Sequence, residues 1–162
     1  MIESILATDM NVHKDLVNDI INTDFETLNL LKMEDQIFLC KFLLHAADLS
    51  NQVRPFKISA RNAAWISEEI SNQIELEKIH NLRPEDSLQS LDALRQAESE
   101  IYFINNLAKP LWQVIVRKMP SLNHLMIQLE ENLHEYEILK EKIKAHDDNS
   151  KKQSITLDAS LV

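Results

Sequence analysis

The chain has 162 residues, enough for one domain with a sizeable core, and nothing in it calls for a second domain. It contains no glycine, which excludes P-loops and the glycine-rich turns that bind dinucleotides. Its formal net charge of −9 argues against binding to a nucleic acid polymer, because such proteins need a concentrated basic face.

The remaining composition favours helices. Four prolines and 6% aromatic residues, beside abundant Leu, Ile, Glu, Asn and Lys, predict an all-α fold whose helices are joined by short polar loops. The single cysteine, Cys40, rules out a disulfide framework and favours a reducing compartment. No apolar run approaches about 18 residues, so no membrane segment is expected. Without a signal peptide either, we expect a cytoplasmic protein.

The first half of the chain predicts two helices. Residues 1–22 carry apolar side chains at helical spacing, with charged side chains turned away from them. Residues 33–50 are apolar on nearly every face, which predicts a central helix surrounded by neighbours. Residues 51–57 follow as a loop that contains Pro55.

The second half predicts further helices. Residues 58–81 form a long helix whose expected inward stripe begins with Trp65 and Ile66. A polar loop follows over residues 82–91. The next helices are expected over residues 91–108, from Pro110 and from Pro120, the last of them amphipathic to residue 143.

The end of the chain has a different composition. Nearly continuous charged and amide side chains mark residues 147–162 as a disordered polar tail. The folded domain is therefore expected to comprise residues 1–146.

The most informative stretch is residues 45–51, His-Ala-Ala-Asp-Leu-Ser-Asn. An apolar run ends here on Asp48 and Asn51, which carry costly polar groups to the edge of the core, so a site is expected at this point. A simpler interpretation is that His45 is a core histidine and that Asp48 and Asn51 cap the helix and turn the chain.

Three other motifs accompany it. Residues 5–13 read Ile-Leu-Ala-Thr-Asp-Met-Asn-Val-His, residues 103–112 contain Phe-Ile and then Pro-Leu-Trp, and residues 129–136 read Leu-Glu-Glu-Asn and end on Tyr. In order and spacing, the four motifs together resemble the C-terminal half of the catalytic domain of the class I 3′,5′-cyclic nucleotide phosphodiesterases. The resemblance implies a compact multi-helix array and hydrolysis of cAMP or cGMP to the 5′-monophosphate.

The resemblance also implies roles for individual residues. Asp48 would be a metal ligand, and Thr8 and Asp9 would approach the metal-bound water. Ile66 and Phe103 would clamp the nucleobase from its two faces. The substrate-binding residues implied in full are Met10, Leu49, Asn51, Ile66, Glu100 and Phe103. Glu100 stands where the family has a glutamine that reads the purine edge.

The family uses zinc together with magnesium or manganese, and most ligands come from His-Asn-x-x-His and His-Asp-x-x-His blocks. Neither block occurs in this chain, and one carboxylate is too few ligands for zinc. The expectation is therefore a fragment that is inactive alone, with the general-acid histidine in the missing half. The alternative is a helical interaction module without chemistry. The choice between cAMP and cGMP and the oligomeric state stay open.

Overall fold

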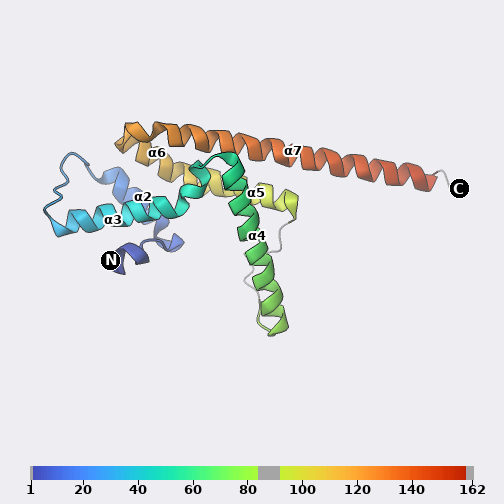
Figure 1. The fold of residues 1–162 in the computed structure, drawn as a ribbon, viewed down its shortest axis with the longest axis horizontal. Coiled ribbons are helices and arrows are strands. Elements are labelled where there is room, and N and C mark those ends of the chain that lie inside the picture. The colour runs from blue at the N-terminus through green and yellow to red at the C-terminus, as the bar shows by residue number, and fades with distance from the viewer. Residues whose placement is uncertain (1, 84–91, 160–162) are drawn as a thin grey trace. The chain divides into compact units, whose positions relative to one another are not determined.

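The structure is a computed structural model that describes residues 2–83 and 92–159, with side chains described as far as residue 146. Every regular element in these ranges is helical, so the all-α prediction is confirmed (Figure 1). Most of the polar loop expected over residues 82–91 lies outside the described residues. None of the described helices is both long enough and apolar enough to cross a membrane.

The helices follow one another through short connections. In chain order they are α1 (Ile2–Leu6), η1 (Met10–Val12), α2 (His13–Asn22), α3 (Met33–Asp48), η2 (Leu49–Val53), α4 (Phe56–Ile79), α5 (Ala93–Phe103), η3 (Ile104–Ala108), α6 (Lys109–Lys118), η4 (Pro120–Leu122) and α7 (Asn123–Ala159). Three of the short elements are 3₁₀ turns, and η3 is a π turn.

The chain divides into two compact units. The first comprises Met1–Ser59 and Tyr102–Asn132, and the second comprises Ala60–Ile101 and Leu133–Val162. The core of the first unit consists of side chains that are almost wholly buried, namely Ile20, Phe42, Ile104, Leu111, Ile115 and Leu129. Each unit is described by itself below.

The single helix expected over residues 1–22 is interrupted. Thr8 donates its hydroxyl to the Ile5 carbonyl at 2.8 Å, and the Asp9 carboxylate accepts from the backbone N–H of Asn11 at 2.9 Å. Short polar side chains compete for backbone groups in this way and favour a turn over a continuing helix. The chain therefore leaves α1 at Leu6 and begins η1 after Asp9.

Helix α3 forms where residues 33–50 predict it, but its burial differs from the expectation. Within α3 only Phe42, His45 and Ala46 are buried, whereas Leu43 is 52% exposed. The prediction of a helix covered on all sides is therefore wrong for the described chain. The first unit places its core against one face of α3 and leaves the opposite face open.

Helix α6 is attached to both of its neighbours in the first unit. The backbone N–H of Lys109 donates to the carbonyl of Ile104, which is the spacing of a π turn. At the other end, Lys118 donates to the carbonyls of Ile21 and Thr23, at 3.2 and 2.6 Å. These bonds satisfy carbonyls that the C-terminus of α2 leaves unpaired.

In the second unit, the inward face of α4 differs from the predicted stripe. Ala63, Ser67 and Ile74 are buried, while Trp65 and Ile66 are more than half exposed. The predicted assignment of Trp65 and Ile66 to an inward face is wrong, because the buried positions recur one helical face away from them.

Helices α5 and α7 are linked in the second unit by Glu98, whose carboxylate lies 3.2 Å from Lys140. Helix α7 continues through Ala159, into the range for which the sequence predicts a disordered tail. The division of the chain at residue 146 stays a prediction.

The turn η2 is closed by Asn132 of α7, which is completely buried in the first unit. Its side-chain N–H₂ group donates to the carbonyls of Gln52 and Arg54, at 2.8 and 2.7 Å. The Asn51 side chain donates in turn to the Ser59 carbonyl at 3.2 Å. One buried amide therefore holds the turn that directly follows Asp48.

We expect Asn132→Ala to lower the free energy of unfolding by about 2 kcal/mol or more, because each buried carbonyl left unpaired costs about 1–3 kcal/mol. Chemical denaturation followed by circular dichroism measures this change. Asn106→Ala is the matched control, since exposed Asn106 also donates to a carbonyl, that of Tyr102. Equal losses in the two variants would contradict the anchoring role of Asn132.

Candidate functional site

The candidate site lies at the C-terminal end of α3. Asp48 is the last residue of this helix and is exposed, whereas His45, one turn earlier, is fully buried. Leu49 follows and is buried in the first unit. The helix therefore ends with one carboxylate at the surface and one imidazole in the core.

His45 forms a buried pair with His13, the first residue of α2. Nδ1 of His13 and Nε2 of His45 are 2.8 Å apart, and the ring centroids are 5.1 Å apart. One of these nitrogens must donate and the other accept, so at least one of the two contacting nitrogens carries no proton. If both nitrogens were protonated, two N–H groups would face each other and the contact would break.

Burial determines the protonation of this pair. The pKa of His13 is lowered by desolvation first and by the neighbouring His45 second, while the carbonyl of Leu107 opposes the shift. The pKa of His45 is also lowered by desolvation, against the effects of the Ala7 carbonyl and the Asp48 carboxylate. Both rings are therefore held in their neutral forms more strongly than an exposed histidine would be.

The histidine pair connects two of the sequence motifs. Thr8, Asp9 and Met10 occupy the turn between α1 and α2, immediately before His13, and Met10 is 40% exposed. Helix α1 packs on α3, where Glu3 forms an ion pair of 2.8 Å with Lys41. The first unit therefore brings the residue 8–10 segment to α3, the helix that ends at Asp48.

The residues expected to bind the substrate divide between the two units. Phe103, half-buried at the end of α5, shares the first unit with Asn51. Ile66 on α4 and Glu100 on α5 belong to the second unit. Ile66 is 53% exposed. The nucleobase clamp between Ile66 and Phe103 stays a prediction.

The residues present do not fit a complete metal centre. Within residues 2–83 and 92–159, no three side chains of His, Cys, Asp or Glu gather in a position to hold an ion. Asp48 offers one carboxylate, and the His13 and His45 nitrogens that face each other are occupied by their mutual contact. An open catalytic zinc site needs three protein ligands.

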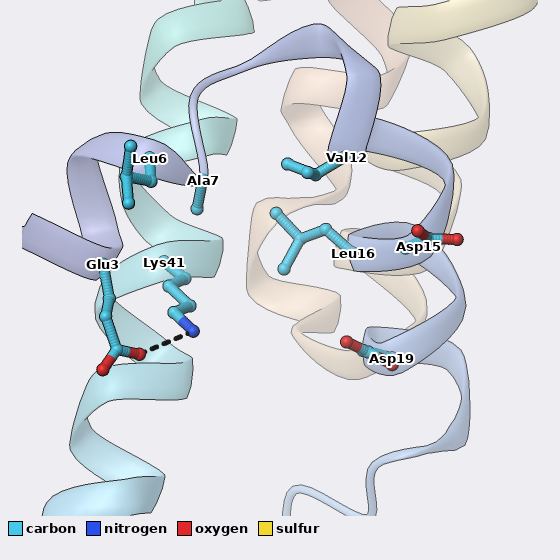
Figure 2. A pocket seen from close by; sticks show the side chains of 8 residues that line it. All are labelled: Glu3, Leu6, Ala7, Val12, Asp15, Leu16, Asp19 and Lys41. Atoms are coloured by element: carbon cyan, nitrogen blue, oxygen red, sulfur yellow. Dashed lines mark ion pairs between the residues drawn. The ribbon is translucent and has the colours of Figure 1, made fainter.

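A cavity of about 270 Å³ lies in the first unit, away from the end of α3 (Figure 2). Figure 2 shows α1 and Lys41 of α3 on one side of it and α2 on the other. Its lining combines apolar and charged side chains: Glu3, Leu6, Ala7, Val12, Asp15, Leu16, Asp19 and Lys41. Of the residues expected at the site, none lines this cavity.

Two features of the site were not predicted from the sequence. Neither the contact between His13 and His45 nor the role of Asn132 follows from helical periodicity. A signal for the first exists, because the motifs of residues 5–13 and 45–51 each contain one histidine. Asn132 lies within the Leu-Glu-Glu-Asn motif, but an amide in an amphipathic helix gives no sign that it is buried.

Comparison with known proteins supports the family resemblance. The family model for 3′5′-cyclic nucleotide phosphodiesterase matches residues 1–129. The human high affinity cGMP-specific 3′,5′-cyclic phosphodiesterase 9A is 30% identical over 141 residues, which are 86% of this chain and 23% of that protein. The mouse 3′,5′-cyclic-AMP phosphodiesterase 4C is 28% identical over 145 residues, 85% of this chain and 21% of that protein.

The folds agree as well. The crystal structure of the phosphodiesterase domain of Salpingoeca rosetta rhodopsin phosphodiesterase matches with a TM-score of 0.78 and 31% identity. The match covers 91% of this chain and 46% of that domain. The chain therefore spans less than half of the solved domain and about a quarter of these curated relatives.

The histidine pair predicts a loss of stability in mild acid. Because both folded-state pKa values are lowered, the unfolded chain binds more protons below about pH 6.5, the ordinary histidine value. Stability is complete above this pH and is lost as the pH falls below it, by about 1.4 kcal/mol per pH unit for each ring that stays neutral. Urea denaturation between pH 7 and pH 5 measures the slope.

The control is the exposed histidine His134, whose side chain is 72% exposed. His134→Gln should leave the slope unchanged, and His13→Gln or His45→Gln should flatten it. A slope that persists after both buried histidines are replaced would show that other groups cause the acid sensitivity.

Proposed function

This chain belongs to the 3′,5′-cyclic nucleotide phosphodiesterase family, and on that premise we propose that it forms the C-terminal part of a catalytic domain that hydrolyses cAMP or cGMP to the 5′-monophosphate. The relatives named above include a cGMP-specific and a cAMP-specific enzyme, at 30% and 28% identity. The proposal therefore covers both cyclic nucleotides.

The observation that carries the proposal is the position of Asp48. It is an exposed carboxylate at the end of an otherwise apolar helix, in a chain that matches the family model over residues 1–129. A helix cap does not require the turn after it to be anchored, yet Asn132 fixes η2 through two hydrogen bonds. A carboxylate held at the edge of a rigid element suits a metal ligand better than a cap.

We propose that Asp48 contributes one ligand to a centre of zinc and magnesium or manganese, with Thr8 and Asp9 near the bound water. The other ligands and the general-acid histidine would come from the rest of the catalytic fold, which this chain does not contain. Hard divalent cations favour carboxylate oxygens, and zinc accepts both carboxylates and imidazoles. The role of the present chain is to supply and orient one carboxylate.

We further propose that the nucleobase lies between Ile66 and Phe103, with Asn51 and Glu100 at its polar edge. Met10 and Leu49 complete the proposed pocket. Two counts along the chain support the clamp, one forward from Asn51 and one back from Pro110. They end on an apolar and an aromatic side chain, which are suited to the two faces of a base.

The purified chain alone should bind zinc weakly and leave cyclic nucleotides intact, because Asp48 has no fellow ligands among the described residues. The full chain should gain metal-dependent hydrolysis when it is fused behind the part of the Salpingoeca rosetta domain that it does not match. Elemental analysis and a nucleotide hydrolysis assay measure both results.

In the fusion protein, Asp48→Asn should reduce hydrolysis by about a hundredfold, the order of loss seen when a metal site is disturbed. Asp19→Asn, which changes an exposed carboxylate of α2, is the matched control and should have no effect. Stoichiometric zinc in the isolated chain would refute the fragment interpretation. A folded fusion protein without activity would favour the non-catalytic helical module.

The polar edge gives a separate prediction for the same fusion protein. Glu100→Gln should lower the KM for a purine cyclic nucleotide, because a carboxylate cannot donate to a ring nitrogen and an amide can. Phe103→Ala should raise the KM about tenfold, since base–aromatic stacking contributes about 1–3 kcal/mol.

The matched control is Glu98→Gln, the same change on the same helix at a carboxylate that pairs with Lys140 of α7. It should leave the KM unchanged. Unchanged kinetics for Glu100→Gln would remove Glu100 from the pocket.

A further inference from the structure

One face of α3 is apolar and exposed along several turns. Its members follow the i, i+3, i+4, i+7 and i+8 spacing of a single helix face: Cys40, Leu43, Leu44, Ala47 and Asp48. We call this set the α3 outer face. All five residues are exposed in the first unit, and Leu43 and Leu44 are 52% and 40% exposed.

The opposite side of the same helix is occupied. Phe42, His45 and Ala46 are buried in the core of the first unit, and Lys41 pairs with Glu3 of α1. Helix α3 is therefore apolar on the side that packs and equally apolar on the side that does not. A helix that only covered a core would carry polar side chains on its outer face.

We propose that the α3 outer face is the docking surface for the complementary part of the phosphodiesterase catalytic fold, a helical polypeptide that covers Leu43 and Leu44. The proposal rests on the proposed function. Its support is the share of the fold that this chain lacks, since it matches only 46% of the Salpingoeca rosetta domain. The surface that the missing part would cover must be exposed in the chain alone.

Asp48 limits the chemistry of the occupant. It lies at the end of the apolar stripe, so a partner that covers Ala47 also removes water from this carboxylate. An unpaired buried charge is strongly unfavourable, which means that the occupant must present a positive group opposite Asp48. Histidines holding a divalent cation meet this requirement and match the ligands that Asp48 lacks.

A second copy of the chain is a poorer occupant. In an antiparallel pair of α3 helices, each Asp48 would approach the first turn of the other helix, which contains Glu34 and Asp35. Like charges would meet at both ends of such an interface, between chains that each carry a net charge of −9. The first unit therefore favours a partner of different sequence.

Cys40 provides a direct test, because it is the only cysteine of the chain and lies on the α3 outer face. Alkylation by iodoacetamide, followed by mass spectrometry, is compared between the isolated chain and the fusion protein described above. Cys40 should react readily in the isolated chain and about tenfold or more slowly in the fusion protein. A control cysteine, Asn18→Cys in a Cys40→Ser chain, lies on exposed α2 and should react equally in both.

Charge variants give a second readout. Leu43→Asp should lower the melting temperature of the fusion protein while leaving that of the isolated chain unchanged, because the side chain is already exposed there. Equal alkylation of Cys40 in both proteins, or an unaffected fusion protein, would overturn the proposal. Protection of Cys40 that grows with the concentration of the isolated chain would also overturn it, in favour of self-association.

The outcomes separate this proposal from the proposed function. If Cys40 is protected but cyclic nucleotides are not hydrolysed, the docking surface is supported and the catalytic proposal fails. If hydrolysis occurs while Cys40 stays reactive, the catalytic proposal is supported and the docking surface is rejected.

Discussion

The hydrogen bond between His13 and His45 is the constraint on which the candidate site depends. A buried imidazole that loses its water must find a partner, and here each ring is the partner of the other at 2.8 Å. The bond fixes the start of α2 against α3, one turn before Asp48. The segment of residues 8–10 lies directly before His13, so its position follows from the same contact.

The sequence predicts the helices well because local patterns decide them. Pro110 and Pro120 stand where α6 and η4 begin, and the apolar run of residues 33–50 becomes α3 followed by η2. The break at residues 8 and 9 was missed because the side-chain bonds of Thr8 and Asp9 prevailed over an apolar periodicity that continues on both sides.

The site was predicted less completely, for two physical reasons. The contact between His13 and His45 joins residues 32 positions apart, and no local pattern specifies which distant side chains meet. The burial of α3 was predicted from its composition alone. A residue's hydrophobicity shows that it will be covered and does not show which polypeptide covers it. Trp65 and Ile66 of α4 illustrate the same difficulty, because an apolar stripe was identified and the wrong face was assigned to the core.

The π turn η3 has a genetic consequence. Residues 104–108 hold one residue more per turn than an α-helix would, between Phe103 and the buried residues Leu111 and Ile115 of α6. A deletion of a single codon here would restore α-helical spacing and rotate Phe103 by about 100° relative to those residues. The length of this turn is therefore under selection independently of its composition, and relatives should differ here by substitution far more often than by insertion or deletion.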